Sequence, residues 1–154
     1  MQPKQSIIIR PAEDKDFAEL YDLGKNTPEL KVSGTEDFMD KDEFRFSMTD
    51  AKSVFLVAET AGELAGFIYA STQDAERPLP NKWACLVYLV VSPKFRRRGI
   101  ASELYKHCLA ELKKRHITNL YCWASVESDG AIKEFMKKQG FAEGHKYMWM
   151  DKKV

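Results

Sequence analysis

The sequence has few cysteines, and their arrangement indicates neither a disulfide framework nor a metal site. Its 154 residues contain three, Cys85, Cys108 and Cys122, and no Cys-x-x-Cys pair occurs. His107 and His116 do not stand at a zinc-ligand spacing from them. Each cysteine lies in an apolar segment, so we predict buried thiols in a reducing compartment.

Long apolar segments and a charge excess are absent as well. The apolar run nearest the N-terminus covers only residues 7–9, too short for a signal peptide. No segment approaches the roughly 18 to 20 apolar residues of a membrane span. The 24 basic and 23 acidic residues leave a net charge of +1, so the broad basic face of a nucleic-acid-binding protein is not expected. We predict a cytoplasmic protein that binds neither membranes nor nucleic acids.

What the chain does contain is typical of one globular domain over residues 1–154. Hydrophobic residues make up 44% and charged residues 31%, which allows a buried core without staples. Strands are predicted at 6–10, 53–60, 63–71, 82–91, 117–126 and 146–154. Helices are predicted from an N-cap at Asp14 to about Gly24, and at 37–50, 100–116 and 128–140. The order β-α-α-β-β-β-α-β-α-β predicts an α/β or α+β domain, a mixed sheet with helices on both faces.

The segment 92–101, SPKFRRRGIA, places three arginines between an apolar strand and an amphipathic helix. The first turn of a helix leaves backbone N–H groups unpaired, and its dipole is positive there. Gly99 lets a ligand approach the backbone closely, and Ala101 is small for the same reason. Such amides, together with guanidinium groups, form a phosphate cradle. A solvated basic turn is the other interpretation of these residues.

The spacing Arg96-x-x-Gly99-x-Ala101, after the strand YLVV, resembles motif A of the GCN5-related N-acetyltransferases, the GNAT family. IIIRPAEDKDFAELYDL, residues 7–23, is similar to the first strand and helix of that family. SDGAIKEFMKKQGF, residues 128–141, is similar to its last helix, which ends in Gly-Phe. The resemblance covers essentially the whole chain. It implies a mostly antiparallel sheet, acetyl-CoA as co-substrate, an amine as acceptor and no metal.

By this resemblance, the strand before the loop carries a bulge and offers backbone groups to the pantetheine arm of CoA. The matching positions are Leu89, Val90 and Val91, which can pack as core residues at the same time. The Leu89 amide is expected to face the thioester carbonyl as an oxyanion donor. The pyrophosphate is expected on the turn formed by Arg96, Arg97, Arg98, Gly99, Ile100, Ala101 and Ser102. Because three guanidinium groups cannot converge on one phosphate, one or two are expected to face solvent or the 3′-phosphate.

The groups that transfer protons depart from the family pattern. The family commonly has a tyrosine as acid where this chain has Met136, and sometimes a strand glutamate as base where it has Cys85. An asparagine that often contacts pantetheine is replaced by Asp129, which accepts but does not donate a hydrogen bond when ionised. Met136 and Asp129 are still expected beside the cofactor. Tyr88 is an alternative proton donor, and the carboxylates that water can reach are Glu127, Asp129, Asp74 and Glu76.

The acceptor is expected beside the first two helices and their loop, at 26–46, and beside the segment 142–146. The region 26–46 is acidic, which suits a cationic amine, although charged faces are usually just solvated. Its acidic residues include Glu29, Glu36, Asp37 and Asp40. Trp83, Trp123 and Phe38 are either core residues or a wall of the acceptor pocket.

Three functions compete on these observations. The first is an acetyl-CoA-dependent N-acetyltransferase that acts by direct transfer on a primary amine of a small molecule or protein. The second is an acyl-CoA-binding sensor or regulatory module with little turnover, which the residues Met136 and Cys85 favour. The third, a nucleic-acid-binding protein built around the three arginines, is disfavoured by the balanced charge. The resemblance also makes a homodimer an expected assembly.

Overall fold

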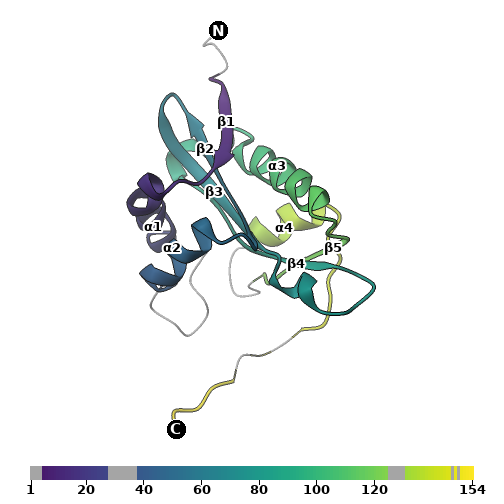
Figure 1. Cartoon of the computed structure of the whole chain (residues 1–154). Helices are drawn as coiled ribbons and strands as arrows, with labels where there is room; N and C mark the ends of the chain where they lie inside the picture. The colour runs from purple at the N-terminus through teal and green to yellow at the C-terminus, as the bar shows by residue number, and fades with distance from the viewer. Residues whose placement is uncertain (1–4, 28–37, 125–130, 147, 149) are drawn as a thin grey trace.

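The computed structural model describes residues 5–27, 38–124, 131–146, 148 and 150–154. Within them, one five-stranded sheet in the order β1-β2-β3-β4-β5 separates two helical layers (Figure 1). The strands are β1 (Ile7–Pro11), β2 (Ser53–Thr60), β3 (Glu63–Ser71), β4 (Trp83–Val91) and β5 (Asn119–Cys122). The helices are α1 (Phe17–Lys25), α2 (Lys41–Thr49), α3 (Ile100–Lys114) and α4 (Ala131–Lys138). The predicted mixed sheet with helices on both faces is confirmed.

The first four strands pair antiparallel, and β5 joins β4 in parallel. The hairpin between β2 and β3 turns at Ala61 and Gly62, whose φ angles are 52° and 77°. Positive φ at both turn residues matches the right-handed twist of the flanking strands, so a two-residue connection suffices. The bounds of β2 and β3 are those predicted from the sequence.

Each face of the sheet has its own core. On one face, α3 and α4 cover the sheet with residues such as Leu104, Leu112 and Met136. On the other face, α1 and α2 enclose aromatic side chains, among them Phe44 and Phe67. The predicted apolar face of α3 is confirmed, because Leu104, Cys108 and Leu112 are almost fully buried. Figure 1 shows α1 and α2 on one side and α3 on the other.

The cysteine prediction holds only in part. Cys108 is buried, whereas Cys85 and Cys122 are half-buried, and all three are free thiols. Among the described residues, no helix has the length and apolar character needed to cross a bilayer.

The predicted strand at 146–154 is wrong for the residues that the structure describes. Lys146, Met148 and residues 150–154 have no regular structure, and Tyr147 and Trp149 lie outside the described residues. Met148 and Met150 are 84% and 85% exposed, and the C-terminal segment leads away from the sheet (Figure 1). Alternating apolar residues form a strand only where a sheet edge pairs with their backbone. Here no such pairing is made.

Two other predicted elements are shorter or start differently. The strand predicted at 117–126 is confirmed only over Asn119–Cys122, and residues 125–130 lie outside the described part. Asp14 does not cap α1, since a short 3-10 turn precedes that helix. Asp16 is the N-cap residue of α1 instead, and its Oδ2 accepts a hydrogen bond from the backbone N–H of Glu13 at 2.8 Å.

Arg10 ties β1 to the start of α1 and to β2. Its Nη1 and Nη2 donate to Oδ2 and Oδ1 of Asp16 at 2.7 and 2.9 Å, and its Nε donates to Glu59 at 3.1 Å. Asp16 is only 5% exposed. The Arg10 hydrogen bonds hold the pKa of the Asp16 carboxyl below its usual value, although burial acts in the opposite direction. Removing the guanidinium would leave a buried carboxylate without its partner.

We therefore expect Arg10→Ala to lower the free energy of unfolding by about 3 kcal/mol at neutral pH. Because the folded-state pKa of Asp16 is depressed, this contribution is present above the unfolded value and is lost as pH falls through the folded one. The difference in the free energy of unfolding between wild type and variant should thus become smaller as the pH is lowered, as measured by urea unfolding. Lys94→Ala breaks an exposed pair with Glu63 and should cost less than about 1 kcal/mol. Equal losses for the two variants would contradict this account.

Candidate active site

The site is built around the place where β4 and β5 part. The two strands pair in parallel from Trp83 opposite Asn119 to Leu86 opposite Cys122. Beyond Cys122, no described residue pairs with β4. Among the described residues, none pairs with this side of β4 over residues 87–91, and we call this side the open edge of β4.

A bulge in β4 lies where this pairing stops. Tyr69 of β3 faces Tyr88, but the next residue, Ala70, faces Leu86, so Val87 is skipped. An extra residue bends a strand and increases its local twist. The bulge implied by the family resemblance is confirmed.

The open edge of β4 presents backbone groups of Leu89 and Val91. The amide of Ser92 donates to the Ala65 carbonyl of β3 at 2.8 Å, so it points toward β3. Consecutive residues of a strand direct their backbone groups to opposite edges, which turns those of Val91 and Leu89 toward the open edge. Arg96 Nε donates to the Val91 carbonyl at 3.4 Å, in agreement with this direction. The site thus holds an N–H group at the position predicted for the oxyanion donor.

The loop after β4 carries the chain into α3 through two left-handed residues. Phe95 is 5% exposed and anchors the loop in the core. Arg97 has φ 62° and Gly99 has φ 79°. Turns of this kind can direct successive N–H groups to one side and form an anion-binding concavity. The first turn of α3, which starts at Ile100, adds its unpaired amides and the positive end of its dipole.

Space for a ligand exists in front of this loop. A Cβ built on Gly99 would meet no atom of the described residues within 4 Å. The absence of a side chain at Gly99 therefore serves the backbone angle and the open space, and not packing inside the protein. Binding of the pyrophosphate by the loop and the first turn of α3 stays a prediction.

The three arginine side chains point to different partners. Arg98 lies over the Phe95 ring at 5.4 Å and donates to Gln5 at 3.4 Å. Arg96 reaches back to the open edge of β4. Arg97 is exposed. The expectation that they do not converge on one phosphate agrees with this arrangement.

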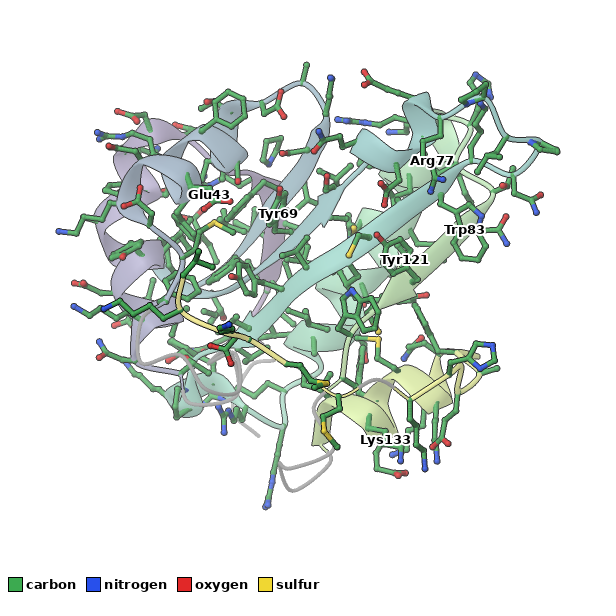
Figure 2. All side chains as sticks on the ribbon, turned by 90° about the horizontal axis from the view of Figure 1, so that it is seen from below. Glu43, Tyr69, Arg77, Trp83, Tyr121 and Lys133 are labelled. Carbon is green, nitrogen blue, oxygen red and sulfur yellow. The ribbon has the colours of Figure 1, made fainter. Side chains whose placement is uncertain are left out.

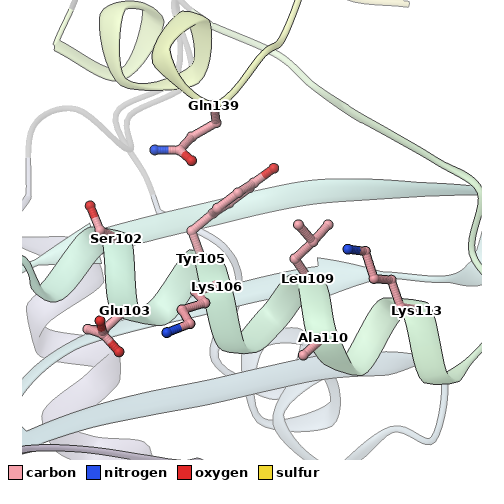
Figure 3. Close-up of a pocket in the computed structure, with 8 residues that line it drawn as sticks. All are labelled: Ser102, Glu103, Tyr105, Lys106, Leu109, Ala110, Lys113 and Gln139. Carbon is pink, nitrogen blue, oxygen red and sulfur yellow. The ribbon is translucent and has the colours of Figure 1, made fainter.

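A groove of about 530 Å³ runs along α3 from Ser102, in its first turn, toward the end of α4. Figure 3 shows Ser102, Tyr105 and Leu109 along α3, with Gln139 above Tyr105. Lys106 and Lys113 also line the groove. The carboxylate of Glu103 lines the groove as well. The hydroxyl, ammonium and amide groups of the groove, beside apolar surface, are of the kind that bind a polar ligand, and contact with the nucleotide end of CoA stays a prediction.

Of the two residues expected beside the cofactor, Met136 and Asp129, the structure describes only Met136. Met136 is 4% exposed and packs in the core with α3 and the sheet, so its side chain has a packing role. Asp129 lies outside the described residues, and so does Glu127.

The structure limits the roles open to Cys85 and Tyr88. Burial raises the pKa of the Cys85 thiol, which keeps it protonated at neutral pH and unsuited to act as a base. Burial also raises the pKa of Tyr88 to about 12, and the charge of Glu43 adds to the shift. Tyr88 lies on the side of α1 and α2, 5.3 Å from Phe38 and 6.3 Å from Tyr69 between ring centroids. Phe38 is thus part of the aromatic core.

The carboxylates named from the sequence separate into two kinds. Asp74 Oδ2 accepts a hydrogen bond from the Tyr121 hydroxyl at 2.5 Å. Glu76 forms an ion pair with Lys52 at 2.8 Å and does not line a pocket with Asp74, so it leaves the set of candidates. Glu29, Glu36 and Asp37 lie outside the described residues, and Asp40 caps α2 by accepting two backbone amides.

Sequence reasoning missed Tyr121, which joins Trp83 and Trp123 in a row of aromatic rings. Leu120 and Cys122 face the α3 core, so strand alternation turns Tyr121 to the other face. The ring centroids of Trp83 and Tyr121 are 6.1 Å apart, and those of Tyr121 and Trp123 are 6.5 Å apart. Trp123 is 71% exposed and is therefore not a core residue. The alternation of the segment 119–123 carried the signal.

The chain belongs to the acetyltransferase (GNAT) family, whose sequence profile matches residues 17–141. An uncharacterized N-acetyltransferase of Methanocaldococcus jannaschii is 32% identical over 100 residues, which are 65% of this chain and 44% of that protein. The chain thus corresponds to less than half the length of that relative. Among the described residues, no group of three or more His, Cys, Asp or Glu side chains is placed to hold a metal ion.

Solved structures share the fold. A transcriptional regulator from Bacillus halodurans C-125 superposes with a TM-score of 0.76 at 18% identity, over 95% of this chain and 99% of that one. AAC(6′)-Iy, in complex with the bisubstrate analogue CoA-S-monomethyl-acetylneamine, superposes with a TM-score of 0.76 at 16% identity, over 97% of this chain and 99% of that one. The aminoglycoside 6′-N-acetyltransferase AAC(6′)-Ih from Acinetobacter baumannii superposes with a TM-score of 0.73 at 22% identity, over 97% of this chain and 99% of that one.

Gly99→Glu should weaken CoA binding at least tenfold, about 1.4 kcal/mol, because a side chain and a negative charge enter the space in front of the loop. Gly62→Glu is a matched control. Its φ of 77° imposes the same backbone strain, and its site in the β2–β3 hairpin is likewise free of neighbours. Calorimetric titration with CoA, next to thermal unfolding of both variants, tests this. Equal affinities for CoA would rule out the loop as the phosphate site.

Proposed function

We propose that this protein is an N-acetyltransferase that moves the acetyl group of acetyl-CoA directly to a primary amine. The observation that carries the proposal is the open edge of β4, which leads through a left-handed loop into the N-terminus of α3. That arrangement offers amides to a thioester at one end and to a pyrophosphate at the other. The bisubstrate analogue bound by AAC(6′)-Iy, which joins CoA to an acetylated amine, supports the same chemistry.

In this reaction the neutral amine attacks the thioester carbonyl, and a carbon–nitrogen bond forms. The negative charge that develops on the carbonyl oxygen is stabilised by the Leu89 N–H group. The intermediate collapses with cleavage of the carbon–sulfur bond, and CoA leaves as the thiolate. The amine gives up its proton to water, and the thiolate receives one.

Tyr88 is a poor source of the proton that the thiolate takes up. Its pKa is raised to about 12, whereas an ordinary thiol has a pKa of about 8.5. Transfer from Tyr88 to the thiolate is therefore uphill by several kcal/mol. Its hydroxyl can donate a hydrogen bond, and we propose that water supplies the proton. Tyr88→Phe should then lower kcat less than about tenfold, and a loss of 100-fold or more would overturn this assignment.

A second function, an acyl-CoA-binding module with little turnover, is favoured by the packing role of Met136. Both functions require CoA binding, so turnover separates them. Calorimetry should give micromolar or tighter binding of acetyl-CoA and much weaker binding of ATP, which lacks the pantetheine arm. Release of CoA, followed with a thiol reagent in the presence of primary amines, should then exceed the amine-free rate. Binding without amine-dependent release would support the module, and absence of binding would overturn both.

Location and assembly are part of the proposal. Three free thiols favour a reducing compartment, and we propose the cytoplasm.

The exposed Met148 and Met150 of the C-terminal segment favour a homodimer, because apolar side chains far from the body gain from burial against a second copy. Light scattering of the purified chain would give twice the monomer mass of 17.7 kDa, and a monomer would refute the dimer.

A further inference from the structure

A second cavity, of about 320 Å³, lies on the face of the sheet opposite α3. It is lined by Asp74, Arg77, Leu79, Trp83, Tyr121 and Trp123. Figure 2 shows Trp83, Tyr121 and Arg77 together near the β4–β5 end of the sheet, away from Glu43 and Tyr69. The volume is in the range of small-molecule sites.

The cavity lies along the strands that form the reaction centre. Trp83 starts β4, and Tyr121 pairs with Cys85 of the same strand. Trp123 follows the last paired residue of β5, so the aromatic row ends where the open edge of β4 begins. The helices on this face, α1 and α2, pack over β3 and β2. The turn Gln73–Glu76 contacts β4 instead and lies beside the cavity. Leu89 lies three residues beyond Leu86 along β4, so the proposed reaction centre lies toward the Trp123 end of the row.

The chemistry of the lining selects a flat body and a positive charge. Indole and phenol faces take up rings and attract cations. Asp74 adds a carboxylate at a fixed position, because Oδ2 accepts the Tyr121 hydroxyl at 2.5 Å. Arg77 also lines the cavity, but its residue is exposed and lies at the rim.

We propose that this cavity is the acceptor site, and that the acceptor is a small molecule with a ring body and two amino groups. One ammonium group pairs with Asp74, the ring lies on the row of Trp83, Tyr121 and Trp123, and the second amine, in its neutral form, reaches the thioester beside Leu89. This assignment rests on the proposed transferase function, and it adds the substrate class.

Three probe amines distinguish the requirement for a ring from the requirement for a second amino group. 1,4-Bis(aminomethyl)benzene has a ring and two amines, benzylamine has the ring and one amine, and 1,6-diaminohexane has two amines without a ring. We expect KM for the first to be about tenfold lower than for either of the others, since each lost contact is worth about one factor of ten. Equal KM values for all three would overturn the proposal.

Variants assign the two contacts to residues. Asp74→Asn keeps an oxygen for the Tyr121 hydroxyl and removes the charge, so KM for the diamine probe should rise about tenfold while KM for benzylamine stays the same. Trp123→Ala should raise KM for both ring-bearing probes about fivefold and leave 1,6-diaminohexane unaffected. Glu76→Gln, on the same turn, and Ile8→Ala, which shortens an apolar side chain 54% exposed on β1, are the controls.

Arg77→Ala decides the sign of the charge that the acceptor carries there. Removing the guanidinium should lower KM for the diamine probe, because one repulsive charge is lost. A higher KM would show that Arg77 holds an anionic group, and this would overturn the assignment of a diamine acceptor.

The binding of acetyl-CoA, measured by calorimetry in every variant, distinguishes the possible failures. If acetyl-CoA does not bind or no amine is acetylated, the proposed function itself fails. If amines are acetylated but Asp74→Asn and Trp123→Ala behave as the controls do, only the acceptor site fails. Acetylation of protein amines with none of the three probes accepted would place the acceptor among macromolecules and also overturn the assignment.

Discussion

The end of strand pairing between β4 and β5 is the constraint on which the rest of the molecule depends. A sheet normally satisfies the backbone groups of every inner strand. Here the parallel pair stops at Leu86 and Cys122, and the bulge at Val87 turns the rest of β4 away. The backbone groups of Leu89 and the N–H group of Val91 face this edge, while the Val91 carbonyl accepts a hydrogen bond from Arg96. The loop and α3 begin just beyond them.

In the proposed arrangement, the sheet keeps the two substrates apart until they meet at this opening. The groove along α3 lies on one face, and the row of Trp83, Tyr121 and Trp123 lies on the other. Alternation along β5 is the physical cause, because a strand that buries Leu120 and Cys122 against α3 must turn Tyr121 to the opposite side. A thioester and an amine that approach from opposite faces come together at the gap between the strands.

Proton transfer is the part of the reaction for which the chain has made least provision. Met136 is a core residue, Cys85 keeps its proton, and Tyr88 lies in an aromatic layer that raises its pKa. In the proposed reaction, the oxyanion contact and the positioning of the substrates supply most of the acceleration, with water as the carrier of protons. Such an enzyme would depend strongly on the amine arriving in its neutral form.

Local sequence determined much of this protein. Apolar runs bounded by turn residues predicted β2, β3 and β4 nearly to the residue, helical spacing predicted α3, and the segment from Arg96 to Ala101 indicated the phosphate loop, because each of these signals depends on near neighbours in the chain. Tertiary structure decided what depends on distant partners. The pairing of Tyr121 with Asp74, the burial of Met136 and the register that opens β4 join residues far apart in sequence. The segment 146–154 shows the same limit, since its alternation fits a strand, but a strand forms only where another edge pairs with it.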